Sequence, residues 1–123
     1  MTGRYELKTL PSFKDERGIL CVLENFLPFE VKRTYWINSE KNQIRGGHRH
    51  KKTRQALVVV QGNVTISVDD SIHQKKVNLF QPNQLLIIEP EDWHEIYFNE
   101  KSCVLVFASE EYQEQDYIFE SYR

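Results

Sequence analysis

Two histidines near the middle of the chain are the residues best suited to carry out chemistry. The segment Arg45-Gly-Gly-His-Arg-His50 places imidazoles at positions i and i+2, and side chains two residues apart on an extended strand project from the same face. An unperturbed imidazole titrates at about pH 6.5, so the pair can exchange protons with one bound molecule. Neutral imidazole is also a common metal ligand. The spacing therefore predicts either acid–base catalysis or a metal site inside a pocket.

The surroundings of this pair resemble the first motif of the cupin barrels. The spacing is His-x-His-x4-Gln-x6-Gly, ending at Gln55 and Gly62, and His94 stands where the second cupin motif places its own histidine. Cupins that bind iron, manganese or zinc combine three histidines with a carboxylate, and first-row ions favour imidazole with anionic oxygen. Gln55 offers only a neutral amide oxygen, which weakens a divalent site. We therefore expect a barrel site with no metal, and a metal-dependent cupin remains the alternative.

Longer stretches of the chain resemble the dTDP-sugar 3,4-ketoisomerases, small cupins that are also called WxcM-like. Members of that family convert a nucleotide-linked 4-keto-6-deoxyhexose into its 3-keto isomer for later amination. They need no metal or organic cofactor, and they are dimers of jelly-roll barrels. The similarity covers nearly the whole chain, in the right order, through Arg45–Val58, Val68-Asp-Asp70, Pro90-Glu-Asp-Trp-His94, Val106–Tyr112 and Asp116-Tyr-Ile118. The resemblance implies an isomerase without a cofactor, acting on a dTDP-linked keto sugar.

The histidines suit this reaction. Moving a carbonyl group from C4 to C3 requires removal of the C3 proton, passage through an enediol and return of a proton to C4. Groups that titrate near neutral pH serve both transfers. By resemblance, His48 is the base at C3, and His50 assists proton delivery at C4 or between the two oxygens.

Further residues are candidates for binding the sugar nucleotide. Arg45 is a cation at any ordinary pH and can stabilise the developing enolate. Arg33 and Tyr35 alternate along one predicted strand and so share a face. The resemblance places that face in the pocket, with Arg33 at the pyrophosphate and Tyr35 bonding the sugar or carrying a proton. The alternative is that they are ordinary surface partners. His94 and Gln55 are expected to line the pocket, with His94 as a wall and not as a catalyst.

One detail departs from the family pattern. A small residue often separates the two histidines, whereas this chain has Arg49. Strand alternation predicts that this side chain faces the outside of the barrel. The nearby cations Lys51, Lys52 and Arg54 are either a solubilising turn or a contact for a diphosphate. Trp36 and Trp93 are expected to be packing residues, and the alternative is that one of them stacks on the thymine.

The rest of the chain predicts an all-β protein, and the resemblance specifies a cupin-type double-stranded β-helix, or jelly-roll barrel. Short strands separated by polar turns are typical of sandwiches and barrels. The link Gln61-Gly-Asn63 joins two β-branched runs and predicts a tight hairpin with positive φ at its glycine. After residue 109 we expect one helical turn and then an extended segment. The predicted strands are Tyr5–Leu10, Ile19–Glu24, Lys32–Ile37, Gln55–Val60, Val64–Val68, Lys75–Leu79, Leu85–Ile88, Glu95–Phe98 and Val104–Ala108.

Length and composition narrow the class of protein. A chain of 123 residues with 40% hydrophobic and 12% aromatic residues predicts a single folded domain over residues 1–123. The net charge of −2 argues against nucleic-acid binding through bulk electrostatics. An apolar stretch of membrane-spanning length and a signal peptide are both lacking, so we expect no membrane partner and a cytoplasmic location. Cys21 and Cys103 lie in apolar runs and are expected to be buried free thiols.

Other functions fit parts of the same pattern. A nucleotide-sugar-binding cupin without turnover would keep the pocket but exchange no protons. A sugar epimerase also begins by removing a proton next to a ketone. The family resemblance predicts a homodimer, and the apolar strand Tyr5–Leu10 is a candidate to extend the sheet of a partner subunit.

Overall fold

Nearly all regular structure in the computed structural model, which describes residues 5–123, is β-strand. This agrees with the many short runs of β-branched and aromatic residues that turn residues separate. A single 3-10 turn, η1, stands near the C-terminus. The elements are β1 (Glu6–Thr9), β2 (Ser12–Asp15), β3 (Gly18–Cys21), β4 (Arg33–Ser39), β5 (Ile44–His50), β6 (Gln55–Gln61), β7 (Val64–Asp69), β8 (Gln74–Leu79), β9 (Gln84–Ile88), β10 (Trp93–Phe98), β11 (Ser102–Ala108), η1 (Glu114–Asp116) and β12 (Tyr117–Ile118).

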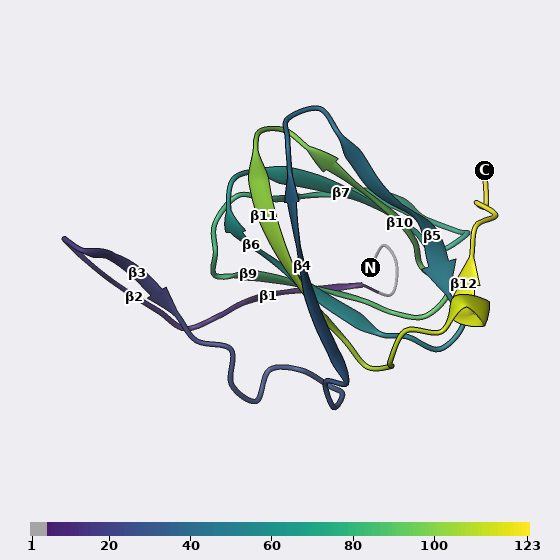
Figure 1. Ribbon diagram of the computed structural model, residues 1–123, viewed down its shortest axis with the longest axis horizontal. Helices are drawn as coiled ribbons and strands as arrows, with labels where there is room; N and C mark the ends of the chain where they lie inside the picture. Colours follow the sequence, from purple (N-terminus) through teal and green to yellow (C-terminus); the bar gives the residue numbers. More distant parts are fainter. Residues whose placement is uncertain (1–4) are drawn as a thin grey trace.

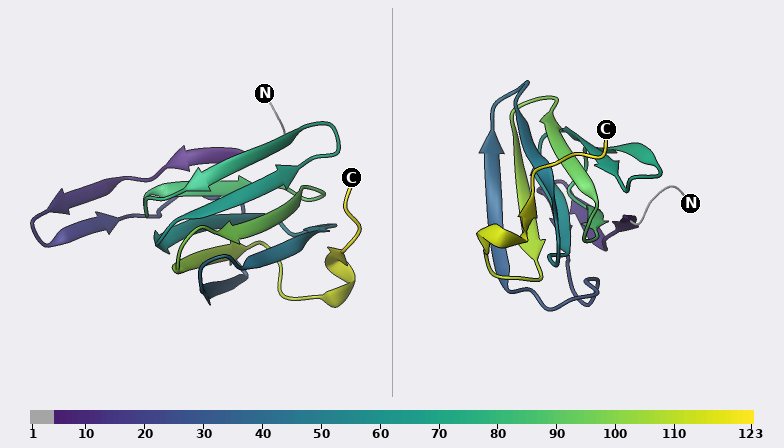
Figure 2. Two further views of the ribbon diagram at one scale, coloured as in Figure 1. Left: turned by 90° about the horizontal axis from the view of Figure 1, so that it is seen from above. Right: turned by 90° about the vertical axis from the view of Figure 1, so that its right-hand side faces the viewer.

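Two five-stranded antiparallel sheets form the body of the molecule (Figure 1). The first sheet has the order β1-β9-β6-β11-β4, and the second has the order β12-β5-β10-β7-β8. Neighbouring strands are mostly far apart in the sequence, as in a jelly roll. The sheets lie face to face, which Figure 2 shows from two further sides. The predicted all-β, cupin-type jelly-roll fold is confirmed.

The main hydrophobic core lies between the sheets. Alternate residues of each strand point inward, so β6 contributes Leu57 and Val59 while β10 contributes Ile96 and Phe98, all of them buried. Tyr35 and Ile37 of β4 pack against this core but are themselves only partly buried. The core therefore fills most of the space between the sheets, and the part near Tyr35 is less tightly closed.

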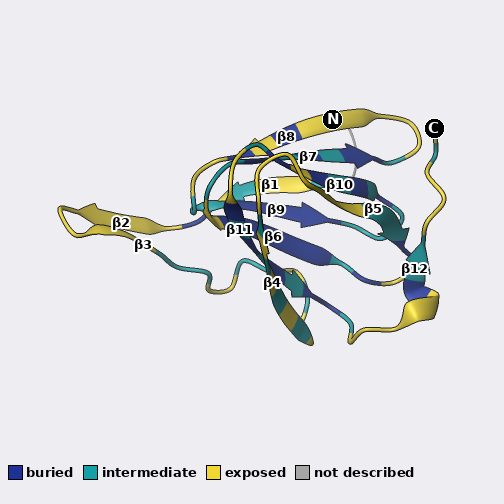
Figure 3. Ribbon diagram, turned by 45° about the horizontal axis from the view of Figure 1, so that its top comes forward, coloured by how far each residue is buried: buried dark blue, intermediate teal, exposed yellow. Residues whose placement is uncertain are grey.

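A second cluster covers the outer face of the first sheet. β6 and β9 are buried on both faces (Figure 3), which explains their nearly continuous apolar sequence. Ala56 and Val58 of β6, with Ile87 of β9, pack against Phe26 and Phe29 from the segment between β3 and β4. This segment closes the first sheet from outside, so the polar chemistry must lie on its inner face.

The link over residues 61–63 is not a hairpin, and this prediction is wrong. β6 pairs with β9 and β11, whereas β7 pairs with β8 and β10, so the link carries the chain from one sheet to the other. Gly62 does have a positive φ of 111°, and a Cβ there would lie 2.1 Å from Oγ of Ser102. A short link between two β-branched runs fits a corner between sheets as well as a hairpin, and sequence pattern does not separate the two.

The other elements follow the predictions closely. Each of the nine predicted strands is present, with bounds that differ by at most three residues. The tail forms η1 and then the short strand β12, as expected. β2 was not predicted, because Ser12–Asp15 is short and polar. Cys21 and Cys103 are free but only partly buried, which corrects the expectation of buried thiols.

Two parts of the chain extend from the barrel at opposite ends. β2 and β3 form a two-stranded ribbon that projects away from the sheets, and the C-terminal tail lies beside β5 and β12 (Figures 1 and 2). Within residues 5–123, no helix has the length and apolarity needed to cross a membrane. The ribbon is far from the histidines, whereas the tail borders them.

Candidate active site

The strand that carries the histidine pair contains a β-bulge. Glu95 pairs with Gly46 and its neighbour His94 pairs with His48, so Gly47 is an extra residue on β5. Gly46 has a φ of 88° and Gly47 a φ of 78°, a region that glycine adopts without steric cost. A Cβ on Gly46 would lie 2.9 Å from the carbonyl oxygen of His94. The two glycines are therefore what allows the bulge to form.

The bulge decides which side chains meet. On a regular strand, residues three apart face opposite sides, yet Arg45 and His48 both line one cavity. The extra residue shifts the alternation by one position. Beyond it, His48 and His50 again share a face. The Gly46-Gly47 pair just before the histidines is thus the sequence feature that lets Arg45 and the two imidazoles meet at one cavity.

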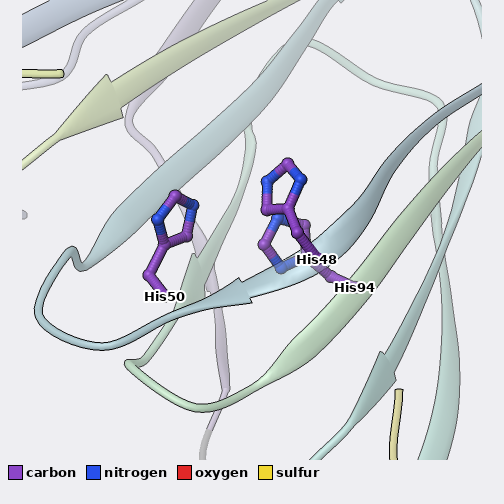
Figure 4. Close-up of side chains that lie close together, drawn as sticks. All are labelled: His48, His50 and His94. Atoms are coloured by element: carbon purple, nitrogen blue, oxygen red, sulfur yellow. The ribbon is translucent and has the colours of Figure 1, made fainter. Parts of the chain in front are cut away.

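Three imidazoles gather at this point (Figure 4). The ring centroid of His48 lies 4.9 Å from that of His50 and 5.0 Å from that of His94, and both contacts are edge-on. One nitrogen from each ring lies within 4.8 Å of the others. His50 and His94 are buried, and His48 is partly exposed. The structure therefore brings the three predicted histidines together at one point.

A buried carboxylate holds one of these rings. Nδ1 of His50 lies 3.0 Å from Oδ2 of Asp116, and Asp116 also accepts hydrogen bonds from the hydroxyl of Thr53 and from the backbone N–H of Lys52. Burial alone would raise the pKa of Asp116, but these hydrogen bonds outweigh it and hold that pKa below its ordinary value. An ionised Asp116 can only accept a hydrogen bond, so Nδ1 of His50 carries the proton, and this fixes the tautomer of the ring.

The fixed tautomers leave the other ring nitrogens available as bases. His94 places Nδ1 3.1 Å from the carbonyl oxygen of Asp92, and a carbonyl can only accept, so Nδ1 carries the proton. For His50 the proton is on the side of Asp116, and its Nε2 is buried without a hydrogen-bond partner among residues 5–123. A buried polar atom without a partner is uncommon and indicates a group that meets a ligand.

Burial keeps all three rings neutral near pH 7. Burial and the neighbouring His50 lower the pKa of His48 to about 4. Burial and His48 lower the pKa of His94 to about 3. Burial also lowers the pKa of His50, although the hydrogen bond and charge of Asp116 oppose that shift. Neutral imidazoles can accept a proton from carbon, and His50 is the one whose protonated form has an anionic neighbour.

The first sheet supplies the opposite wall of the site. Arg33 and Tyr35 alternate along β4 and both face the cavity, as predicted. Nε2 of Gln55 donates a hydrogen bond of 3.0 Å to the hydroxyl oxygen of Tyr35. The phenol can then donate its own proton elsewhere. A carboxylate at position 55 would instead accept that proton, so the neutral glutamine keeps Tyr35 a donor. Burial raises the pKa of Tyr35, which keeps the phenol protonated.

The cavity between these walls has a volume of about 470 Å³. The seven predicted site residues lie in or beside it: six line its wall, and His50 adjoins His48. Nε of Arg33 is buried, with no hydrogen-bond partner among residues 5–123. The lining consists of Arg33, Tyr35, Trp36, Ile37, Arg45, Gly46, His48, Gln55, Leu57, His94, Ile96, Val106 and Tyr117. Two arginines and a row of neutral polar groups make it suited to an anionic, hydroxylated ligand.

Two residues of the tail belong to the site and were not singled out from the sequence. Asp116 holds His50, and Tyr117 packs edge-on against both rings, with centroids 4.9 Å from His48 and 4.5 Å from His50. The only signal for them was their place in a segment that resembles the family. Their distance in sequence from the histidines gave no reason to pair them.

Two expectations about neighbouring residues are settled by the contacts. Arg54 binds Glu89 through Nε and Nη2, at 2.7 and 2.9 Å, so its guanidinium is already engaged by a carboxylate. Trp36 is 64% exposed and lines the cavity, so the expectation that it packs in the interior is wrong. An exposed aromatic ring at the cavity can lie against a sugar or a base.

The same three histidines are the residues that could hold a metal ion. Their nitrogen atoms are close enough to converge on one ion with small movements, and His50 and His94 have the outer hydrogen bonds that metal ligands commonly have. Gln55 lines the same cavity and offers a neutral oxygen, which suits a divalent first-row ion less well than a carboxylate. The donor set therefore differs from the three histidines and one carboxylate of the metal-binding cupins.

Comparison with known proteins agrees with this geometry. The family model described as FdtA, WxcM-like, C-terminal, matches residues 3–123. The chain belongs to this family. Its WxcM-like relatives include the TDP-4-oxo-6-deoxy-alpha-D-glucose-3,4-oxoisomerase of Aneurinibacillus thermoaerophilus, which is 38% identical over 108 residues, or 85% of this chain and 78% of that protein.

Solved structures extend the comparison. A 3,4-ketoisomerase from Helicobacter canadensis is 35% identical, with a TM-score of 0.86 over 94% of this chain and 90% of that one. A histidine-to-asparagine mutant of the 3,4-ketoisomerase QdtA from Thermoanaerobacterium thermosaccharolyticum, in complex with TDP-4-keto-6-deoxyglucose, is 34% identical, with a TM-score of 0.90 over 98% and 90%. The 3,5-epimerase RmlC of Legionella pneumophila, 15% identical with a TM-score of 0.81 over 92% and 70%, shares the fold alone.

Proposed function

We propose that the protein is a 3,4-ketoisomerase that converts a TDP-linked 4-keto-6-deoxyhexose into its 3-keto isomer. The observation that carries this proposal is the group of three neutral imidazoles, one of them oriented by Asp116, at a cavity whose other wall bears arginines and a tyrosine. Membership of the WxcM-like family and the names of the relatives support the same substrate class. The product would serve deoxyamino-sugar biosynthesis.

The proton transfers can be assigned to the residues on the page. In the substrate, C3 carries a hydrogen and a hydroxyl, and C4 is the ketone. His48, which lines the cavity and is neutral, takes the C3 proton while O4 gains one, and this gives the enediol. Loss of the O3 proton and delivery of a proton to C4 complete the isomer. Two protons leave and two return, so the reaction needs no oxidant or reductant.

His50 is suited to the second transfer. Asp116 stabilises the protonated form of His50, and its Nε2 has no other partner among the described residues. A proton carrier must be charged for a moment in a buried place, which an adjacent carboxylate makes less costly. Tyr35, held as a donor by Gln55, would stabilise the charge that develops on the sugar oxygen or pass a proton between the oxygens.

The arginines fit the diphosphate. The guanidinium of Arg33 lies 5.4 Å from the ring of Tyr35 and 5.7 Å from that of Tyr112. Its Nε has no partner among residues 5–123. Guanidinium groups bind phosphate oxygens in a bidentate manner. With Arg45 on the other wall, the cavity offers positive charge for the pyrophosphate, and His94 and Gln55 shape the sugar pocket.

Direct observation of the product tests this function. The purified protein is incubated with TDP-4-keto-6-deoxyglucose, and the sugar is followed by NMR. We expect a 3-keto product with the carbon skeleton unchanged. Inversion at C3 or C5 with the ketone still at C4 would instead identify an epimerase. Tight TDP binding without any change in the sugar would identify a binding protein.

Metal independence is part of the proposal and needs its own measurement. The neutral Gln55 beside three histidines supports catalysis without an ion. Protein stripped with a chelator should turn over at the untreated rate, and elemental analysis should find no stoichiometric transition metal. Activity that disappears on stripping and returns with iron, manganese or nickel would favour the metal-dependent cupin.

The proposal includes a homodimer in the cytoplasm. β1 pairs with β9 and is the edge strand of its sheet, so a partner strand could pair only with its outer side. The β2–β3 ribbon is the better candidate for the dimer contact, because Phe13 is 65% and Leu20 is 59% exposed on it. Exposed apolar patches of this kind mark sites of contact with a partner chain. The free thiols support a reducing compartment. A monomeric mass at micromolar concentration would count against the dimer.

A further inference from the structure

Arg49 makes more contacts than a side chain on the outside of a barrel needs. Its Nη1 lies 2.6 Å from Oε1 of Glu91 and 2.9 Å from the hydroxyl of Tyr122, and its Nε donates to the carbonyl oxygen of Glu120 at 3.1 Å. The guanidinium also lies 4.2 Å from the centroid of the Tyr122 ring. Only 14% of the side chain is exposed. The side chain does point out of the cavity, as alternation predicts, but the C-terminal tail covers it.

These contacts join the three segments that carry the active-site residues. Arg49 itself stands between His48 and His50 on β5. Glu91 lies in the turn before His94, and its backbone N–H donates to the carbonyl oxygen of His50 at 2.8 Å. The hydroxyl of Tyr122 donates to the carbonyl oxygen of Glu91 at 2.7 Å. One guanidinium thus ties together the histidine strand, the turn before His94 and the tail.

The tail needs such a tie to stay in place. β12 contains two residues, and its ladder with β5 consists of Tyr117 opposite His50 and Ile118 opposite Arg49. Two residue pairs of strand are too few to hold a segment against water on their own. The ion pair of Arg123 with Asp69 lies at the very end of the tail, and the arginine is 48% exposed. The Arg49 contacts are more buried than this ion pair, and they add to the hydrogen bonds that Lys51, Lys52 and Thr53 donate to Asp116.

We propose that Arg49 is a positioning residue: it clamps the tail over residues 117–123 to β5, and so keeps Asp116 against His50 and Tyr117 against both catalytic rings. This inference rests on the proposed isomerase function for its catalytic part. It gives a role to the residue that separates the two histidines on β5. Arg49 does not touch the cavity and acts only through Asp116 and Tyr117.

The test compares Arg49→Met with a matched control. The Met side chain keeps length and apolar contact but removes the charge and all hydrogen bonds. Arg54→Met removes an arginine with the same kinds of partner, a carboxylate, a carbonyl oxygen of Pro28 and the ring of Phe29, on a surface away from the tail. Both variants lose stability, but only Arg49→Met should loosen Asp116 from His50.

The readout that separates positioning from stability is the Nδ1–H proton of His50, followed by NMR in the absence of substrate. A proton held between imidazole and carboxylate exchanges slowly with water and gives a resolved downfield signal. Asp116→Asn identifies that signal by removing it. We expect the signal to weaken or vanish in Arg49→Met and to persist in Arg54→Met, and backbone amide exchange over residues 117–122 to accelerate in Arg49→Met only.

Turnover gives the catalytic half of the test. We expect kcat to fall about tenfold to hundredfold in Arg49→Met, with a smaller change in KM, because a misplaced proton carrier slows chemistry more than binding. Arg49→Lys, which keeps the charge, should recover part of the loss. Tyr122→Leu should reproduce the effect, and the double variant should be no worse than either single one. Tyr122→Leu also serves if Arg49→Met does not fold.

The outcomes are distinguishable from failure of the proposed function. Wild-type protein without isomerase activity would reject that function, and the NMR signal would still decide whether Arg49 holds His50 against Asp116. Active wild-type protein with an unchanged signal and unchanged kcat in both Arg49→Met and Tyr122→Leu would overturn the clamp. Equal losses in Arg49→Met and Arg54→Met would also overturn it, since stability alone would then explain them.

Discussion

The two sheets meet the cavity with different chemistry and different regularity. β4 and β6 of the first sheet present Arg33, Tyr35 and Gln55, groups that donate hydrogen bonds and keep one charge state near pH 7. β5 and β10 of the second sheet present His48 and His94, whose protonation can change, beside the cation Arg45. β4 and β6 are regular at these positions, whereas β5 contains the bulge at residues 46 and 47. We call the two sides of the cavity the first and the second wall, after their sheets.

This difference separates binding from proton transfer. A wall that orients the sugar nucleotide needs fixed donors, and regular alternation is enough to aim them. A wall that moves protons needs imidazole rings that contact one another and Asp116. On a regular β5 strand, these rings and Arg45 would point to opposite faces. Substitution of the histidines should therefore lower turnover far more than it lowers nucleotide affinity, and substitutions around Tyr35 should lower turnover less.

The largest effect is expected from His48→Asn. Loss of the base should lower kcat by about 10²–10⁴-fold, whereas TDP affinity, which depends on the arginines, should stay within about threefold. Steady-state kinetics and calorimetric TDP titration measure the two quantities. The asparagine side chain is uncharged, and so is the wild-type imidazole near neutral pH. We therefore expect the fold to be unchanged. Turnover at the wild-type rate would remove His48 from its assigned role.

The second test breaks the bulge. Alanine at position 46 must adopt positive φ and meets the carbonyl oxygen of His94 at 2.9 Å, so Gly46→Ala should shift β5 and reduce kcat by roughly 10²-fold. Gly47→Ala is the matched control. It suffers the same kind of φ strain, at about 1–2 kcal/mol, but its nearest new contact is Oε2 of Glu95 at 4.0 Å.

Urea unfolding and kinetics of the two glycine variants decide the point. We expect Gly46→Ala to lose more stability and far more activity than Gly47→Ala. If the two variants lose activity equally, the close approach of Gly46 to the neighbouring strand is not what places the histidines.

A smaller effect is expected on the binding wall. Gln55→Glu replaces the donor to Tyr35 by a carboxylate that accepts the phenol proton, so Tyr35 can no longer offer it to the sugar oxygen. We expect kcat to fall about tenfold, the equivalent of one hydrogen bond of about 1.4 kcal/mol. Tyr35→Phe is the companion variant. If Gln55→Glu keeps full activity while Tyr35→Phe does not, glutamine has no part in orienting the phenol.

The last prediction concerns stability and pH, and not turnover. The unfolded chain binds protons at His48 and His94 below about pH 6.5, whereas the folded chain does not until about pH 4 and about pH 3. The unfolded state therefore gains protons first, and the free energy of unfolding should fall as the pH drops from about 6.5 toward 4, by about 1 kcal/mol per pH unit for each ring. The slope measured by urea unfolding should be shallower in His48→Asn. Equal slopes would contradict the lowered pKa of His48.

The contrast between the walls also explains how much could be predicted. Alternation, a local property of sequence, predicted that Arg33 and Tyr35 share a face, whereas their place at the cavity and that of Gln55 came from the family resemblance. Arg45 was named as a cation near the site, but that it faces the cavity depends on a bulge whose only sequence mark is the Gly-Gly pair. Asp116 was missed because a contact across 66 residues is set by the fold.

Other errors have a physical cause of the same kind. The link at Gly62 satisfied every local criterion for a hairpin, and the pairing partners of β6 and β7 lie elsewhere in the chain. Trp36 was expected to be a packing residue, yet it is 64% exposed at the edge of the cavity. Local pattern predicted strands and faces, and non-local pairing decided which faces meet.

The most direct test of the account is the entry of solvent deuterium into the sugar by metal-stripped protein. TDP-4-keto-6-deoxyglucose is incubated in D2O with chelator-treated wild-type protein, and the product is examined by NMR. The account predicts a 3-keto sugar with deuterium at C4, formed at the rate of untreated protein and abolished in His48→Asn. Deuterium entry that requires an added divalent metal, or that persists at the wild-type rate in His48→Asn, would contradict it.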